Sequence, residues 1–448
     1  MVNYGVSRGC ENCRRRKKKC DEGRPTCERC KKAGISCLGY RSPDQLLFYH
    51  HYVIRSVDPI VSRGFLDGLP FLLFKSHPTS HVVQAAEIVG WASLGDLRNR
   101  LDVLARARTQ HISILDSFPG LYHSCRSSGL TLEVLVTATL LGLYEIISGS
   151  ENHPVPEEGV HGRDICTLFL DPNSSFDLIT SMQSLKIANP LLIKDGLQVQ
   201  PASGSMWTPS SSETIKDLDS ILVKCQPLLE RANTILQDPS ASWIDLNQFS
   251  RWETIERHTA WDLEIMGHLT QADADALPCP YVSPGPVHSY SAIYTAAVMN
   301  TYRVTYLSLL DVLICLAPRC DFRNGQTLFK WENHAWRLIG DFVLSIPFHL
   351  ARSTEEYVAS TTARSGQPPV GRYVGGLFLL HLIYVLSSTP LVPPYYQNYA
   401  RECLDWIGEN MGIGLASVLS RENLKVSNRT MAGWQILIWA GTLLQIDG

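Results

Sequence analysis

The chain has 448 residues, 45% of them hydrophobic, and its net charge of −3 hides a sharp asymmetry. Residues 1–41 hold twelve basic and four acidic side chains, a charge of +8, whereas the remainder holds 28 basic and 39 acidic ones, a charge of −11. This division excludes a protein that is basic over its whole surface. It favours a small polyanion-binding head on a large acidic body with its own core.

The basic segment contains six of the thirteen cysteines, and in it the motif C-x2-C-x6-C occurs twice, seventeen residues apart. The opening MVNYGVSRG has no apolar run to serve as a secretory signal, so we expect a reducing compartment and thiols instead of disulfides. Thiolates favour zinc, which takes four ligands in a tetrahedron. The motif therefore predicts a metal site formed by Cys10, Cys13, Cys20, Cys27, Cys30 and Cys37.

Six sulfurs can give two zinc ions four ligands each only if two sulfurs bridge. The symmetry of the repeat places the bridges at the first cysteine of each half. The two expected ligand sets are Cys10, Cys13, Cys20 and Cys27, and Cys10, Cys27, Cys30 and Cys37. No coordination position stays open, so both ions are expected to be structural, and so short a segment would be unfolded without them. The alternative, a single ion held by the two C-x2-C pairs, leaves Cys20 and Cys37 without a role.

Six consecutive cations follow Cys13 in the stretch CENCRRRKKKC. The residue types predict a short helix over residues 11–18 that ends before Asp21 and Gly23. Such a cationic helix end fits the major groove of DNA, where guanine offers two acceptors to Lys or Arg. The alternative is that the run serves only as a nuclear-import signal.

The stretch GCENCRRRKKKCDEGRPTCERCKKAGISCLGY resembles the binuclear zinc-cluster DNA-binding domain of fungal transcription factors. The resemblance covers residues 7–40 and includes every expected ligand and Pro25, where the family uses a proline to set the turn between the halves. It implies a nuclear, sequence-specific regulator of RNA polymerase II genes that binds double-stranded DNA and contains two structural zinc ions. It also implies the same pair of bridging sulfurs.

In the family that this segment resembles, residues at the carboxyl end of the first helix read a CGG-like triplet. By position, the base-reading residues here are Arg16 and Lys17, with Lys18 adjacent. We expect the other cations to contact phosphates, which supply affinity without sequence information. These are Arg14, Arg15, Lys19, Arg24, Lys31 and Lys32.

A short linker is expected at residues 41–45, followed by an all-α body over residues 46–448. Apolar residues recur there at intervals of three and four, which indicates helices. The candidate helices are 82–94, 98–117, 131–148, 251–269, 291–317, 326–346 and 374–388. The apolar run at 132–148 is short for a membrane span and contains two glutamates, so a buried helix is favoured over a membrane contact.

No heptad repeat follows the cluster directly. A coiled-coil-like spacing from Ile215 to Leu236 contains Pro227, which favours core packing over a zipper. The stretches LLFYHHYV, TATLLGLYEIISGS and LVPPYYQNYARECLDWIGENMGIG resemble the all-helical regulatory domain of one branch of these factors. We expect this body to contact transcription machinery or coactivators and to form at most a weak homodimer.

The body contains no catalytic motif, neither G-x-S-x-G, H-E-x-x-H nor a P-loop, so we expect no enzyme. The neighbouring carboxylates Asp273 and Asp275 are interpreted as a solvated helix end, and His50 and His51 as packed or surface side chains. Two alternatives stay open. The body could be a helical enzyme or metabolite-binding protein with the cluster attached, or the chain could be a nucleic-acid scaffold without sequence specificity.

Overall fold

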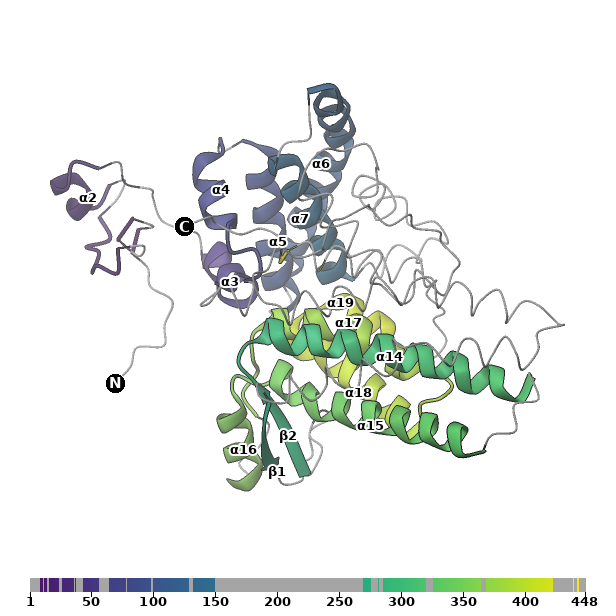
Figure 1. Ribbon diagram of the computed structural model, residues 1–448. Helices are drawn as coiled ribbons and strands as arrows, with labels where there is room; N and C mark the ends of the chain where they lie inside the picture. The colour runs from purple at the N-terminus through teal and green to yellow at the C-terminus, as the bar shows by residue number, and fades with distance from the viewer. Residues whose placement is uncertain are drawn as a thin grey trace.

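The computed structural model describes most of residues 9–37, 43–149 and 269–421, together with Ile438, Gly441 and Thr442. Figure 1 shows a small N-terminal head, which holds the cysteines and helix α2 (Glu28–Lys32), and a large helical body. The expectation of a zinc-cluster head followed by a largely helical body is confirmed.

The N-terminal half of the body is a group of helices around α5 (His81–Leu97). Its other members are α3 (Pro43–Tyr52), α4 (Leu69–Lys75), α6 (Leu101–Ser128) and α7 (Leu132–Ser148). Helix α5 packs against α3, α6 and α7. The apolar run in α7 lies in the core, where Leu140, Leu141 and Ile147 are fully buried, because this helix is apolar on nearly all its sides.

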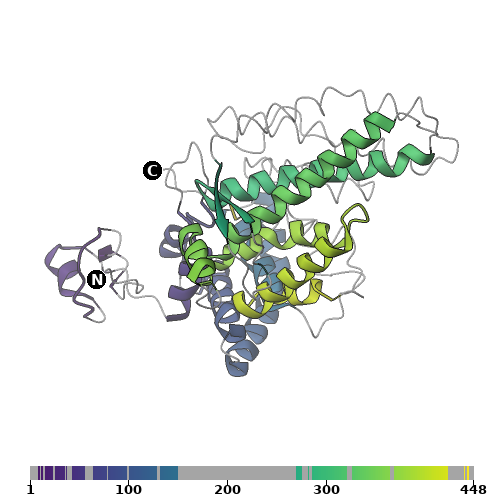
Figure 2. The same cartoon turned by 90° about the horizontal axis from the view of Figure 1, so that it is seen from below.

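The C-terminal half contains a long pair of helices, α14 (Ile293–Arg319) and α15 (Gly325–Leu350), which lie along each other (Figure 2). The remaining helices are α16 (Thr354–Ala363), α17 (Tyr373–Ser388), α18 (Pro394–Met411) and α19 (Gly414–Leu419). Helix α17 packs on α15 and α18, and α19 packs on α7. The two halves therefore share one core.

Two short strands form an antiparallel hairpin beside the helices. Strand β1 (Leu269–Ala274) pairs with β2 (Gly285–Tyr290), with Leu269 opposite Tyr290. The interpretation of Asp273 as part of a helix end is wrong, because this residue lies in β1. Of the candidate helix 251–269, all but the final residue lies outside the described part of the chain, and so does the segment Ile215–Leu236.

The joint between head and body is short. Helix α3 begins at Pro43, so the last three residues of the expected linker, 41–45, form its first turn. The Arg372 side chain donates from Nε to the carbonyl of His50 at 2.8 Å and from Nη2 to the carbonyl of Val53 at 2.6 Å. The His51 ring stacks on Tyr373, with centroids 3.5 Å apart. Helix α3 is thus held against the start of α17.

Five expected helices are confirmed: 82–94, 131–148, 291–317, 326–346 and 374–388. Most of their ends agree with the structure within one or two residues, but α5 continues to Leu97 and α15 to Leu350. The helix expected at 98–117 begins at Leu101 and continues to Ser128. None of the described helices combines the length and the apolar character that a bilayer span requires.

Candidate zinc centre and nucleic-acid interface

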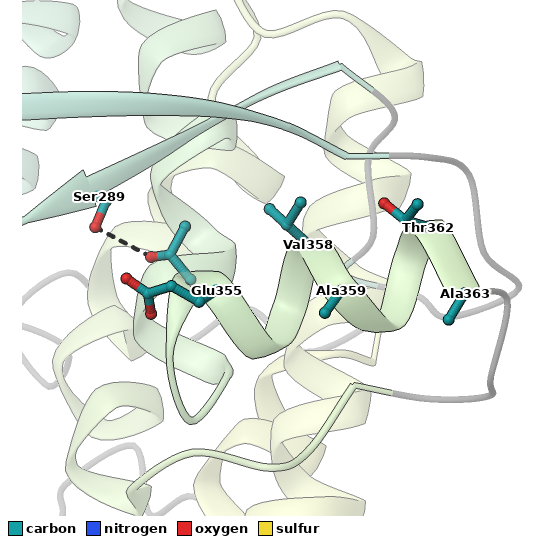
Figure 3. Close-up of a pocket in the computed structure, with 7 residues that line it drawn as sticks. Ser289, Glu355, Val358, Ala359, Thr362 and Ala363 are labelled. Carbon is teal, nitrogen blue, oxygen red and sulfur yellow. Dashed lines mark hydrogen bonds between the residues drawn. The ribbon is translucent and has the colours of Figure 1, made fainter.

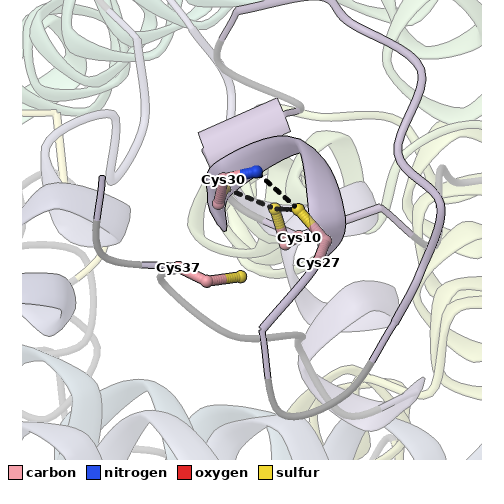
Figure 4. A group of neighbouring side chains, drawn as sticks. All are labelled: Cys10, Cys27, Cys30 and Cys37. Atoms are coloured by element: carbon pink, nitrogen blue, oxygen red, sulfur yellow. Dashed lines mark hydrogen bonds between the residues drawn. The ribbon is translucent and has the colours of Figure 1, made fainter. Parts of the chain in front are cut away.

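The six N-terminal cysteines lie together in the head. Two groups of four have sulfurs that are all within 4.8 Å of one another, and the two groups share Cys10 and Cys27. Both shared residues are fully buried. The groups are Cys10, Cys13, Cys20 and Cys27, and Cys10, Cys27, Cys30 and Cys37, of which Figure 4 shows the second.

The distances between sulfurs fit tetrahedral zinc. A zinc ion with Zn–S bonds of about 2.3 Å has ligands at the corners of a tetrahedron with edges of about 3.8 Å. The Sγ–Sγ distances are 3.6 Å for Cys10–Cys27, 3.7 Å for Cys10–Cys30 and 3.8 Å for Cys13–Cys27. A disulfide would bring two sulfurs to about 2 Å, so these are thiol pairs at metal-ligand separation.

Amide groups point at several of these sulfurs. The backbone N–H groups of Cys10 and Glu22 donate to the Cys20 sulfur, both at 3.4 Å, and the Cys30 N–H donates to the Cys27 sulfur at 3.3 Å. Burial raises the pKa of the Cys10 thiol, and it raises the pKa of Cys27 to about 12. A zinc ion held by these sulfurs would supply the positive charge that favours their ionised form.

Asp21 joins the two halves of the head, which the sequence did not predict. Its carboxylate accepts from the backbone N–H groups of Glu28 at 3.0 Å and Arg29 at 3.3 Å, at the start of α2, and from Gly23 at 3.3 Å. These donors, that of Glu28 above all, hold the pKa of Asp21 below its usual value. The two-residue spacing of Asp21 and Gly23 could have predicted this turn, since an Asp side chain often accepts a hydrogen bond from the backbone N–H two residues on.

The helical turn in each of the two cysteine halves ends in the same local structure. The Lys18 N–H donates to the Cys13 carbonyl at 2.8 Å, and the Ile35 N–H donates to the Cys30 carbonyl at 3.1 Å. In each half the residue before this donor is left-handed, with φ of 49° at Lys17 and 65° at Gly34. This is the Schellman closure of a helix C-terminus.

The helix expected over residues 11–18 is therefore wrong at its end. Asn12 and Cys13 are helical, and the Arg16 N–H still donates to the Asn12 carbonyl at 3.1 Å. The chain then turns at Lys17 and is no longer helical at Lys18. The turn places Lys17, Lys18 and Lys19 at and beyond the end of the helix instead of along its side.

The described cations of the head are exposed. They are Arg16, Lys17, Lys18 and Lys19 at and after the turn, and Arg29, Lys31 and Lys32 on α2. An ion pair of 3.6 Å between Lys31 and Glu28 is open to solvent on both sides and contributes little. The other expected phosphate contacts, Arg14, Arg15 and Arg24, lie outside the described residues.

Comparison with known proteins agrees with this geometry. The family "Fungal Zn(2)-Cys(6) binuclear cluster domain" matches residues 8–46. Transcription factor dbaG of Emericella nidulans is 31% identical over 414 residues, which cover 89% of this chain and 95% of that protein. The chain belongs to the fungal binuclear zinc-cluster transcription factors. No solved structure matches the chain.

A zinc-cluster domain of this family binds two zinc ions, and the clustered sulfurs fit them. The protein is thus a fungal DNA-binding transcription regulator. Six sulfurs can serve two tetrahedral ions only if two sulfurs are shared, and the two groups have Cys10 and Cys27 in common.

The body has a pocket of about 580 Å³ along α16 and β2 (Figure 3). Its lining is mostly small or apolar, and its one carboxylate belongs to Glu355, beside the bond from Thr354 to Ser289 of 3.1 Å. The backbone at the start of α16 holds the pKa of Glu355 below its ordinary value, which makes this carboxylate a poor base. The pocket offers no pair of groups for acid–base chemistry among its lining residues.

Proposed function

We propose that the head reads a CGG-like triplet in the major groove of DNA and that the protein regulates RNA polymerase II genes in the nucleus. The observation that carries this proposal is the left-handed turn at Lys17, which presents exposed cations next to the metal sulfurs. Lys and Arg donate to the two major-groove acceptors of guanine. A short, rigid, positively charged helix end has the shape that such a contact needs.

In this proposal the zinc ligands are Cys10, Cys13, Cys20, Cys27, Cys30 and Cys37. Arg16, Lys17 and Lys18 contact bases, and the neighbouring cations contact phosphates. The phosphate contacts are Arg14, Arg15, Lys19, Arg24, Lys31 and Lys32. The exposure of every described member of these two cationic groups supports the assignment. Phosphate contacts make the affinity fall steeply with salt, whereas base contacts set the preferred sequence.

The domains in this proposal are the head over residues 7–40 and a helical regulatory body that follows it without catalytic activity. The shared core of the body supports its treatment as one unit. Through this body the protein contacts transcription machinery or coactivators and forms a weak homodimer, since no heptad repeat directly follows the cluster.

Selection of duplexes from a random pool with the zinc-loaded, full-length protein tests the proposal. The expected result is enrichment of CGG-like triplets, and the spacing and orientation of paired triplets then report how many heads bind together. Equal recovery of all sequences would favour a scaffold without specificity. Enrichment of an unrelated motif would retain a specific DNA-binding function but remove the CGG-like assignment.

A further inference from the structure

The outer face of α15 exposes two large aromatic side chains. Phe329 is 64% exposed and Trp336 is 52% exposed, and both lie among the few large apolar residues that the described body leaves in solvent. The opposite face of the same helix is buried against the body through Trp331, Ala335 and Leu338. Aromatic side chains are enriched at protein interfaces relative to the rest of the protein surface.

The spacing along this face is that of a coiled-coil seam. Phe329, Asn333, Trp336 and Gly340 follow intervals of four, three and four residues, which correspond to positions d, a, d and a of a heptad. A Cβ built at Gly340 would meet nothing within 4 Å, so the seam is open at that point. We refer to these four residues as the α15 seam.

Charged side chains flank the α15 seam with opposite signs on its two sides. Glu332 occupies position g, and Lys330 and Arg337 occupy the two e positions. Arg337 forms an ion pair of 3.8 Å with Asp341, one turn further on, and its side chain is half exposed. A partly exposed pair of this length contributes little, so it does not prevent Arg337 from turning toward a closer partner.

We propose that the α15 seam pairs in parallel with the same seam of a second copy of the chain. In a parallel pair, position g of one helix faces position e of the partner five residues on, which sets Glu332 against the second copy's Arg337. In an antiparallel pair like flanks meet, so Lys330 and Arg337 would face cations. Asn333 at position a selects the parallel register at some cost in affinity.

The seam covers only residues 329–340, less than two heptads, so the contact is small and the dimer is weak. This inference rests on the weak homodimer of the proposed function and names its surface. A weak pairing in solution becomes effective when two heads bind neighbouring triplets, because DNA holds the two chains at high effective concentration.

Sedimentation of the full-length, zinc-loaded protein tests the pairing. We expect the wild type to dimerise reversibly as its concentration rises to about 100 μM. The change Glu332→Arg, which sets cations against cations, should weaken the dimer roughly tenfold. The double change Glu332→Arg with Arg337→Glu restores opposite charges and should recover most of the wild-type affinity.

The double change Phe329→Ser with Trp336→Ser should weaken the dimer by at least about a hundredfold, because it removes the apolar centre of the contact. Ile112→Ser is the matched control, since Ile112 is 50% exposed on α6 and lies outside the seam. All these side chains except Glu332 are exposed, so circular dichroism should show an unchanged fold.

A dimer that ignores the α15 substitutions would overturn this interface and leave the homodimer itself standing. A chain that stays monomeric over the whole range would overturn both, and the exposed face would then belong to another partner. A dimer weakened by Glu332→Arg but not restored by the second reversal would overturn the parallel register.

Discussion

Lys17 and Gly34 are seventeen residues apart and adopt the same left-handed backbone, with φ of 49° and 65°. In each case the following N–H closes onto the carbonyl of the second cysteine of its half. Glycine adopts this conformation without cost, whereas a lysine loses about 1 kcal/mol. A residue that keeps an unfavourable backbone and places a cation at the tip of the head fits a functional side chain.

Lys17→Gly separates the side chain from the turn that carries it. Glycine relieves the left-handed strain, so the zinc-loaded head should fold at least as well as the wild type. Affinity for the preferred duplex should fall by about 1–3 kcal/mol, with a smaller loss on a scrambled duplex. Fluorescence anisotropy with both duplexes at one salt concentration measures this.

Gly34→Ala is the matched control for Lys17→Gly. A Cβ at this position meets nothing within 4 Å, so the only cost is the backbone strain, about 1 kcal/mol of head stability. Sequence preference should stay as it is in the wild type. An unchanged site preference in the Lys17→Gly protein would show that Lys17 does not read the bases.

The grouping of the six cysteine sulfurs was predictable from their number and spacing. Six sulfurs and two tetrahedral ions require two bridges, and the repeat places them at Cys10 and Cys27, the residues common to both sulfur groups. The end of the first helix was not predictable in this way. Helix propensity favours the run of cations throughout, but the closure from Lys18 to Cys13 overrides it.

Long helices such as α5, α14 and α15 were predicted well, because apolar residues recur in them over several turns. The start of α3 could also have been predicted, since proline is favoured at the first position of a helix and Pro43 occupies it.

The hairpin of β1 and β2 was not predicted, for a different reason. LTQADA and GPVHSY contain few β-branched residues, so their pairing depends on the helices around them.

Replacing a bridging sulfur should affect both metal ions, whereas replacing a terminal one should affect one. We expect Cys10→Ser to lose both zinc ions and Cys37→Ser to retain the ion of the other group. Native mass spectrometry of the full-length protein counts the ions directly, against two in the wild type. Equal metal content in the two variants would argue against Cys10 as a bridge.

Arg372→Met should loosen α3 from the body. Arg372 satisfies two carbonyls at the end of this helix, and methionine would leave both without this donor. The expected loss is about 2–4 kcal/mol of unfolding free energy. Denaturant titration measures it, and amide exchange should rise over residues 43–52.

Arg401→Met provides the comparison for Arg372. Its guanidinium donates to the side-chain oxygen of Asn398 at 2.8 Å, an exposed bond, and to the Ser387 carbonyl at 3.3 Å. It therefore reaches one backbone carbonyl instead of two, and its loss should cost less than that of Arg372. Arg372→Lys should fall between the wild type and the methionine variant, because one ammonium group cannot match the fork that reaches two carbonyls. Equal stability of the two methionine variants would remove the special role of Arg372.

Glu145→Gln should stabilise the body at alkaline pH. Burial in α7 raises the pKa of Glu145 to about 7 from an ordinary value near 4.5. Between these values the folded state binds more protons than the unfolded state, so this residue makes stability fall as pH rises. Glutamine cannot ionise. The free energy of unfolding of the variant should therefore rise relative to that of the wild type between pH 5 and pH 8. The rise should be at most about 3 kcal/mol, because Glu145 keeps some contact with solvent.

Urea unfolding of both proteins at pH 5 and pH 8 measures the difference. Glu355→Gln is the control of opposite sign, since the pKa of Glu355 is lowered at the start of α16 and its charged form is the favoured one. The Glu355→Gln protein should be no more stable to unfolding than the wild type at pH 8. A stability difference for Glu145→Gln that is the same at both pH values would mean that the Glu145 carboxyl is not in the apolar core in solution, because only a buried carboxyl resists ionisation there.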